Sequence, residues 1–309
     1  ARTVLLHTGG WKRTEEEAMG WVRILTESHI PFDEMPLSGL GSLEQLAGKQ
    51  LLVLPDIARI PKMQAALIDA FARAGGTVLA TGGTAQGKGS APLQCLGVAN
   101  VRETRRGLRS SMLEIPGAER ATFPRCVQAP YVDFGDELLC IDPSGGAKTY
   151  LRLIPEHPFG PPECCCFTKK EEIPGLVVSP CGFGRGVYLP WKGGALYQRE
   201  GLANPFLFLQ DVLFGFCGVQ DLAPGLTPMV ELVLCQKEEQ LVVQLVNGTG
   251  CFANSWFAPV PVRDIHLSLP GVSGAVRTLN GGRLTVQEKS GALEVVLDVL
   301  DEYEAIVIQ

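Results

Sequence analysis

The hydroxyl of Thr81 is the side chain in this sequence best placed to act as a nucleophile. It ends an apolar run, TVLAT, and the next two residues are Gly82 and Gly83. This is a strand running into a tight glycine turn, and a threonine hydroxyl attacks acyl groups when a base lies close. A purely structural interpretation is equally simple. In it, Thr81 ends the strand and hydrogen-bonds the turn.

The segment Gly82–Gly89, GGTAQGKG, nearly matches a phosphate-binding loop of the form G-x-x-x-x-G-K-[ST]. Gly89 replaces the hydroxyl residue that would hold magnesium, and Pro92 weakens the helix that should follow. We therefore expect Lys88 to be a solvated loop residue and the protein to need no nucleotide or other cofactor. Gly182–Gly186, GFGRG, fits a tight hairpin turn better than a dinucleotide site.

Two short clusters combine aromatic rings with cations and follow predicted strands. The first is Trp11, Lys12 and Arg13, and the second is Trp191, Lys192, Tyr197 and Arg199. An exposed tryptophan beside cations can stack on a sugar ring or contact a partner subunit, whereas core packing of the rings would serve neither purpose. The candidate ligand or interface crevice consists of Trp11, Lys12, Arg13, Thr81, Gly82, Gly83, Trp191 and Tyr197.

Alternating strands and helices are predicted around these residues. Apolar runs indicate strands at 2–7, 30–35, 50–55 and 77–81. Strands that alternate with helices in this way imply a parallel sheet with right-handed crossovers, that is, a doubly wound α/β fold. Ligands of such sheets sit beyond the carboxyl ends of the strands, which here carry 7–13, 55–56 and 81–84.

Two helices are predicted between these strands. Thr14 and Glu17 form a capping box, T-x-x-E, ahead of apolar residues at helical spacing. The second helix begins at Pro61 and ends at Gly75-Gly76. Its predicted inner face consists of Leu67, Ala70, Phe71 and Ala74.

Beyond this sheet the periodicity changes twice. An irregular insertion at about 87–172 is predicted to hold short strands at 109–114 and 150–154, followed by a hairpin of 176–179 with 186–190 and a helix at 205–216. A linker at 223–228 leads to strands at 230–236, 240–247, 262–269, 283–288, 293–297 and 305–309. These predict a small antiparallel sandwich, with domains at 1–222 and 228–309. Asn247-Gly248 fits a type I′ turn better than a glycosylation site.

The composition limits the classes of partner. The chain has 309 residues, a net charge of −6 and no apolar run of about 18 residues, so neither nucleic acid nor membrane is expected as a partner. The N-terminus lacks a signal-peptide pattern. The ten cysteines include no CxxC pair, and Cys164-Cys165-Cys166 cannot converge on one ion from a strand. Cys217 and Cys235 lie in apolar runs. We expect reduced, mostly buried thiols, no bound metal and a cytoplasmic protein.

Residues 79–83, LATGG, resemble the G-x-C-x-G turn of class I glutamine amidotransferases, with Thr81 in place of the cysteine nucleophile. The His and Glu of the family's triad should follow as H-x-E. His157 with Glu156 or Glu163 does not match that spacing. The resemblance therefore implies the family's scaffold without its nucleophile.

A more specific resemblance covers essentially the whole chain. IPFDEMPLSGL, QLLVLPDIARIPKMQAALIDAFARAGGTVLATGGTA and GFGRGVYLPWKGGALYQREG look like the β-galactosidase trimerisation domain of family-42 glycoside hydrolases. The tail, from VELVLCQKEEQLVVQLVNGTG to LDEYEAIVIQ, resembles the C-terminal β-sandwich of the same proteins. The fold implied is a flavodoxin-like, amidotransferase-like α/β domain followed by a β-sandwich.

In that family the catalytic glutamates lie on a preceding (β/α)8 barrel of about 250 residues, which no stretch of this chain could supply. The resemblance thus implies a non-catalytic region that forms homo-oligomers or packs against a catalytic barrel, with carbohydrate contact as a further role. The alternative is an amidotransferase-like hydrolase with a degenerate nucleophile site at Thr81.

Overall fold

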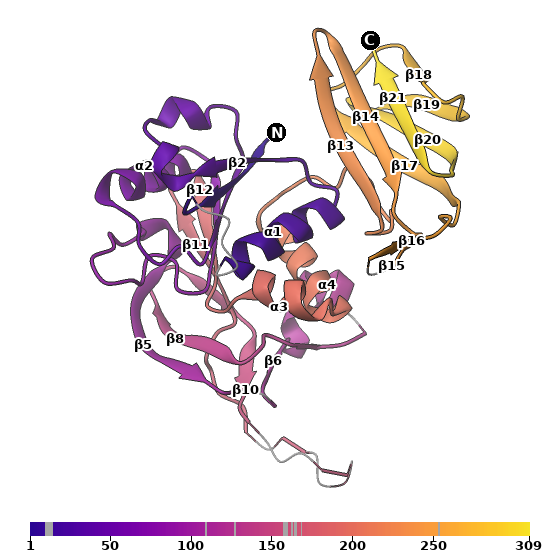
Figure 1. Ribbon diagram of the computed structural model, residues 1–309. Helices are drawn as coiled ribbons and strands as arrows, with labels where there is room; N and C mark the ends of the chain where they lie inside the picture. The colour runs from indigo at the N-terminus through magenta and orange to yellow at the C-terminus, as the bar shows by residue number, and fades with distance from the viewer. Residues whose placement is uncertain are drawn as a thin grey trace. The chain divides into compact units, whose positions relative to one another are not determined.

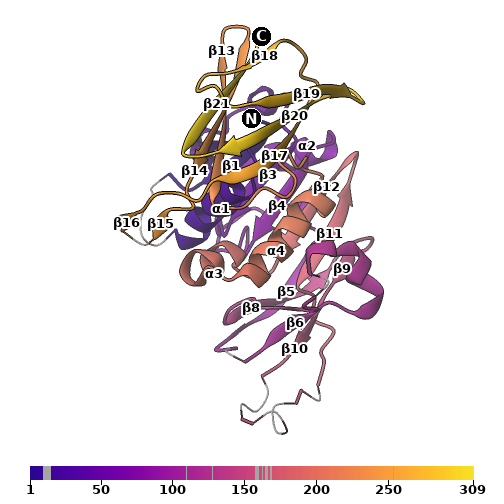
Figure 2. The same ribbon diagram turned by 90° about the vertical axis from the view of Figure 1, so that its right-hand side faces the viewer.

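A computed structural model describes residues 1–9, 15–108, 110–126, 128–156, 160–161, 163, 166–167, 169–252 and 254–309. The chain divides into two compact units (Figures 1 and 2). The first comprises Ala1–Ile24 and Phe32–Val219, and the second comprises Leu25–Pro31 and Gln220–Gln309. No local pattern in the sequence indicates that Leu25–Pro31, at the end of the first helix, groups with the second unit.

The first unit is built on a mixed sheet of seven strands. In sheet order these are β2 (Phe32–Pro36), β1 (Thr3–His7), β3 (Leu51–Pro55), β4 (Thr77–Thr81), β12 (Gly184–Leu189), β11 (Leu176–Cys181) and β9 (Lys148–Tyr150). The pairings from β2 to β12 are parallel, and those of β12 with β11 and of β11 with β9 are antiparallel. The predicted α/β class, the four N-terminal strands and the hairpin are confirmed.

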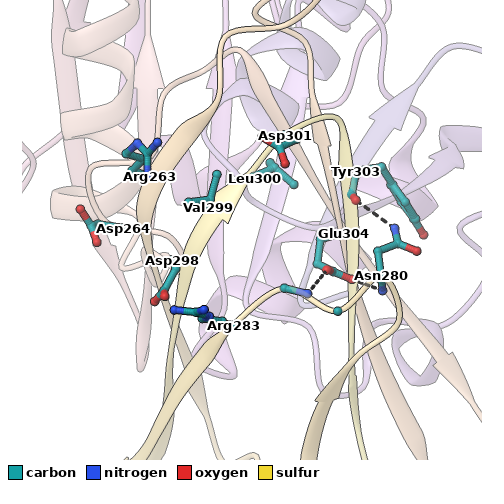
Figure 3. A pocket seen from close by; sticks show the side chains of 12 residues that line it. Arg263, Asp264, Asn280, Arg283, Asp298, Val299, Leu300, Asp301, Tyr303 and Glu304 are labelled. Atoms are coloured by element: carbon teal, nitrogen blue, oxygen red, sulfur yellow. Dashed lines mark hydrogen bonds between the residues drawn. The ribbon is translucent and has the colours of Figure 1, made fainter.

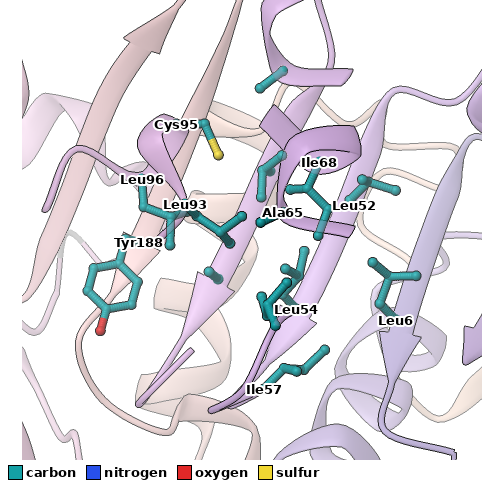
Figure 4. Close-up of a cluster of buried hydrophobic side chains, with 14 of the residues drawn as sticks. Leu6, Leu52, Leu54, Ile57, Ala65, Ile68, Leu93, Cys95, Leu96 and Tyr188 are labelled. Atoms are coloured by element: carbon teal, nitrogen blue, oxygen red, sulfur yellow. The ribbon is translucent and has the colours of Figure 1, made fainter. Parts of the chain in front are cut away.

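The central strands β3 and β4 are buried at every residue, which explains their unbroken apolar sequence. Helix α2 (Lys62–Arg73) packs into the same hydrophobic cluster, where Ala65 and Ile68 lie with Leu52 and Leu54 of β3 (Figure 4). Its predicted inner face is only partly correct, since Phe71 is buried and Leu67 and Ala70 are half-buried. Ala74 is exposed, and the stripe that faces the sheet is Ala65, Ile68, Phe71 and Ala72.

The other helices of this unit are α1 (Glu16–Glu27), α3 (Gly193–Glu200) and α4 (Ala203–Asp211). Helix α4 continues into a π-helical turn at Val212–Phe216, so the predicted helix at 205–216 exists but changes its winding. Thr14 of the predicted capping box lies outside the described residues, whereas the Glu17 carboxylate is directed into the protein, as described below.

The insertion contains more regular structure than the sequence indicated. β5 (Val98–Arg106) pairs with β8 (Glu137–Pro143), and β10 (Arg152–Ile154), β6 (Met112–Glu114) and β7 (Tyr131–Val132) form a three-stranded sheet. β5 was missed because its sequence, VANVRETRR, is mostly polar and its residues are exposed or half-buried. A ribbon without a buried face leaves no alternating apolar pattern to read.

The second unit holds two larger antiparallel sheets. One has the order β13 (Val230–Lys237), β14 (Gln240–Asn247), β21 (Tyr303–Ile308) and β18 (Val276–Thr278), and the other β17 (Val262–Pro270), β20 (Ala292–Leu300) and β19 (Leu284–Lys289). Alternate residues of β14 and β20 are buried, and both sheets contribute to one hydrophobic cluster. A separate two-stranded ribbon joins β15 (Cys251–Phe252) to β16 (Ser255–Trp256).

Two expectations for this unit were wrong. Neither Asn247 nor Gly248 has a positive φ, so they do not form a type I′ turn. The Asn247 amide is buried and donates to the carbonyl oxygens of Val260, Leu300 and Asp301. An amide held in this way ties chain segments together and cannot accept a glycan. Cys235 is exposed, because it lies on the outer face of β13.

Candidate functional site

Thr81 is completely buried at the end of β4, with an exposed fraction of 0 %. Its hydroxyl donates to Glu17 Oε1 at 2.7 Å, and its carbonyl oxygen accepts from the Thr84 hydroxyl at 2.7 Å. The hydroxyl that the sequence singled out as a nucleophile is therefore shielded from solvent and already committed to a hydrogen bond within the protein.

Glu17 is the partner that the sequence did not reveal. Its Oε1 also accepts from Trp21 Nε1 at 2.8 Å, and its Oε2 accepts from the Ala195 N–H at 2.7 Å. Burial raises the pKa of this carboxyl, and hydrogen bonds from Ala195, Thr81 and Trp21 partly offset that rise. One carboxylate thus joins α1, the end of β4 and the first turn of α3.

A signal for Glu17 was present in the sequence, although it was read as a capping residue. Glu17 lies four residues before Trp21 and is next to Ala18, so it falls on the apolar face of the helix. A charged residue on such a face needs buried partners. Its partners could not be named, because Thr81 and Ala195 are 64 and 178 residues away along the chain.

The glycine turn after Thr81 is held by Asp56, at the end of β3. Asp56 Oδ1 accepts from the Gly83 N–H at 2.6 Å, and its Oδ2 lies 2.8 Å from Lys192 Nζ. Asp56 and Gly82 both have positive φ, of 51° and 55°. A Cβ at Gly82 would lie 2.6 Å from Asp56 Oδ1, so only glycine fits there. The Tyr188 hydroxyl donates to the Gly82 carbonyl oxygen at 2.6 Å.

A small cavity lies at the carboxyl ends of β1 and β3, bordered by His7, Thr8, Glu15, Glu17 and Asp56 among others. Its volume is about 60 Å³, whereas pockets for small-molecule ligands measure roughly 300–1,000 Å³. The cavity is large enough for water and too small for an acyl substrate. The geometry around Thr81 is that of a buried junction between chain segments.

The predicted crevice is only partly described by the structure. Trp11, Lys12 and Arg13 lie outside the described residues, so that part of the prediction stays a prediction. The Gly82 N–H donates to the backbone oxygen of Trp191 at 3.0 Å, which brings the glycine turn and the second cluster together.

The rings of the second cluster are buried. Trp191 donates its indole N–H to the Gly175 carbonyl oxygen at 2.9 Å. The Tyr197 ring stacks on Phe206, with 4.8 Å between the ring centroids, and the Arg23 guanidinium lies 4.5 Å from the Tyr197 ring centroid. In this structure both rings serve packing.

The second unit, in contrast, exposes aromatic rings that the sequence analysis did not select. Phe252, Trp256 and Phe257 are 74 %, 62 % and 61 % exposed, and Val260 beside them is also exposed. We call Phe252, Trp256, Phe257 and Val260 the aromatic hairpin. The available signal was the segment 247–261, NGTGCFANSWFAPVP, which carries no charge.

Neither a metal centre nor a membrane span is apparent in the described part of the chain. No three histidine, cysteine, aspartate or glutamate side chains within it are grouped as metal ligands. Among the described helices, none is long and apolar enough to cross a membrane.

Solved structures share this fold over the whole chain. An α-L-fucosidase isoenzyme 2 from Paenibacillus thiaminolyticus is similar with a TM-score of 0.75 at 17 % identity, and a β-galactosidase from Bacillus circulans sp. alkalophilus with 0.64 at 13 %. A catalytic mutant of a GH42 β-galactosidase from G. stearothermophilus gives 0.59 at 15 %. All of this chain is covered in each comparison, but only 48 %, 41 % and 40 % of those chains.

The fold is therefore that of a part of these glycoside hydrolases, as the resemblance of the sequence to family-42 enzymes predicted. The chain spans less than half the length of each of them. No protein-family model matches the sequence, and no curated protein sequence matches it significantly.

Proposed function

We propose that this chain is a non-catalytic region of a glycoside-hydrolase-like protein, which forms oligomers or packs against a catalytic barrel. The observation that carries this proposal is the burial of Thr81 with its hydroxyl bonded to Glu17. The site where an amidotransferase of this architecture would hold its nucleophile is thus a structural junction. The strand order β2-β1-β3-β4-β12 supports a flavodoxin-like class for the first unit.

The aromatic hairpin supports the second half of the proposal. Large exposed apolar patches mark interaction surfaces, and tryptophan is among the residues that dominate binding energy at protein interfaces. Because the similar enzymes are more than twice as long as this chain, protein surfaces beyond its own residues are natural candidates to cover these rings. The free thiols of the described cysteines support a reducing, cytoplasmic setting.

Light scattering across micromolar concentrations tests self-association. We expect a mass above that of one chain, and a shift toward the monomer for Trp256→Ala. The matched control is Val286→Ala, since Val286 is an exposed apolar residue of β19 outside the aromatic hairpin. A strictly monomeric wild type that also fails to bind a family-42 barrel supplied in trans would refute the proposal.

Activity assays address the alternative, a hydrolase that uses Thr81. One observation favours it, because the Glu17 carboxylate lies within hydrogen-bond reach of the Thr81 hydroxyl, as a general base would. That alternative predicts hydrolysis of glutamine or an activated ester, abolished by Thr81→Val. The non-catalytic proposal predicts no turnover by either protein, and none on aryl galactosides or fucosides.

A further inference from the structure

A polar pocket of about 560 Å³ lies at one end of the second unit (Figure 3). β17 contributes Arg263 and Asp264, and β20 contributes Asp298. The loop between β18 and β19 contributes Asn280 and Arg283, and the first residue of β21 is Tyr303. The volume lies within the range of small-molecule sites.

Four charged side chains of this pocket have no partner among the described residues. Across the described residues, Arg263, Asp264, Arg283 and Asp298 form neither salt bridges nor side-chain hydrogen bonds. Asp301 adds a third carboxylate of this kind, so two guanidinium forks and three carboxylates border one concave surface with their hydrogen-bonding capacity unused.

The backbone around the pocket is held rigidly. The buried Glu304 carboxylate accepts from the N–H groups of Leu279, Asn280 and Gly282, at 3.1, 2.9 and 3.0 Å. The Asn280 amide donates to the Tyr303 carbonyl oxygen at 3.0 Å. A loop fixed before binding loses little entropy when a ligand arrives.

Asp264 adds a conformational irregularity at the same place. Its φ is 53°, within strand β17, a backbone conformation that non-glycine residues seldom adopt. Such strain is often found where a side chain must point in a particular direction for binding.

The mixture of charges selects the class of ligand. An anion would meet the aspartates, and a cation would meet the arginines, so neither is matched by the whole lining. A neutral polyhydroxylated molecule both donates and accepts hydrogen bonds, and can use guanidinium and carboxylate groups together. Tyr303 lies at the rim of the pocket, where its side chain is 41 % exposed and its hydroxyl donates to Gln244 Oε1 at 3.2 Å.

We propose that this pocket binds a neutral saccharide through Arg263, Asp264, Arg283 and Asp298. The pocket itself is inferred from the second unit alone, and the choice of sugars for its test rests on the function proposed above. It is a binding site separate from the Thr81 junction and from the aromatic hairpin.

Calorimetric titration of the full chain with L-fucose, D-galactose and lactose, up to about 50 mM, tests this proposal in the range of weak, millimolar affinities. We expect one saturable site for at least one sugar. Arg283→Ala and Asp298→Ala should each raise its Kd about tenfold or more, because each removes charge-assisted hydrogen bonds. Both side chains are exposed and unpaired, so the variants should fold.

The matched control is Arg277→Ala, since Arg277 is an exposed arginine of β18 outside the pocket. Its Kd should equal that of the wild type. The proposal is overturned if no sugar binds, if the pocket variants bind like wild type, or if only sodium phosphate or calcium chloride binds. Light scattering on the same samples separates this proposal from the proposed self-association. If the chain forms oligomers but binds no sugar, only the saccharide site is rejected. If the chain is monomeric but binds sugar, only self-association is rejected.

Discussion

Thr81→Val is the substitution that most directly tests the structural role of the hydroxyl. Valine has nearly the same shape as threonine and a high preference for strands, so β4 and its packing should persist. The change removes the donor that lies 2.7 Å from Glu17 Oε1, and both groups are buried.

The size of the effect follows from the charge of the acceptor. A hydrogen bond to a charged group contributes about 1.5–3 kcal/mol, compared with roughly 0.5–1.5 kcal/mol for a neutral pair. Glu17 keeps its bonds from Trp21 and Ala195 in the variant. We therefore expect a loss of about 2 kcal/mol in the free energy of unfolding of the first unit at pH 8.

The pH dependence provides a second signature. Burial raises the pKa of folded Glu17 above its unfolded value, so its favourable contribution is complete below the unfolded pKa and is lost as pH rises through the folded pKa. The Thr81 hydroxyl lowers that folded pKa, and removing it raises the pKa further. The stability difference between wild type and variant should thus be largest at pH 8 and shrink toward acid pH, where Glu17 is protonated in both.

Urea unfolding at pH 8 and at acid pH measures this difference, with tryptophan fluorescence reporting on Trp21 beside Glu17. The control is Thr77→Val, at the start of the same strand, because Thr77 is buried and forms no side-chain hydrogen bond with any described residue. The reasoning is refuted if Thr81→Val costs no more than Thr77→Val at pH 8, or if its cost grows as the pH falls.

Two further substitutions probe the same turn. Thr81→Cys restores the cysteine of the amidotransferase motif. Because the position is buried beside a carboxylate, the thiol should resist labelling reagents in the folded protein and confer no glutaminase activity. A labelled, active variant would contradict the structure. Gly82→Ala should lower the free energy of unfolding by about 2–4 kcal/mol, because Gly82 has a positive φ and an added Cβ would clash with Asp56. The control is Gly117→Ala, which should be nearly neutral because a Cβ there meets nothing within 4 Å. Equal urea midpoints for the two variants would disprove the steric argument.

Part of the fold could be predicted because its signals are local. β3 and β4 are uninterrupted apolar runs, and Gly82 follows Thr81 directly, so the strand and its glycine turn are visible within seven residues. β5 gave no such signal, since a ribbon with polar faces has no periodic pattern. Asn247 was misread because an Asn-Gly pair is a local turn signal, whereas its buried amide bonds are made to Val260, Leu300 and Asp301.

The sequence by itself determined that Thr81 ends a buried strand at a glycine turn and that the triad spacing of an amidotransferase is absent. Only the tertiary structure decided what the hydroxyl does, because its partner Glu17 lies 64 residues away and the third element, at Ala195, lies 178 residues from Glu17. Periodicity fixes which face of a strand or helix is buried. The packing of separate elements sets the distances between their side chains. It therefore also decides that the Thr81 hydroxyl is buried and bonded to Glu17.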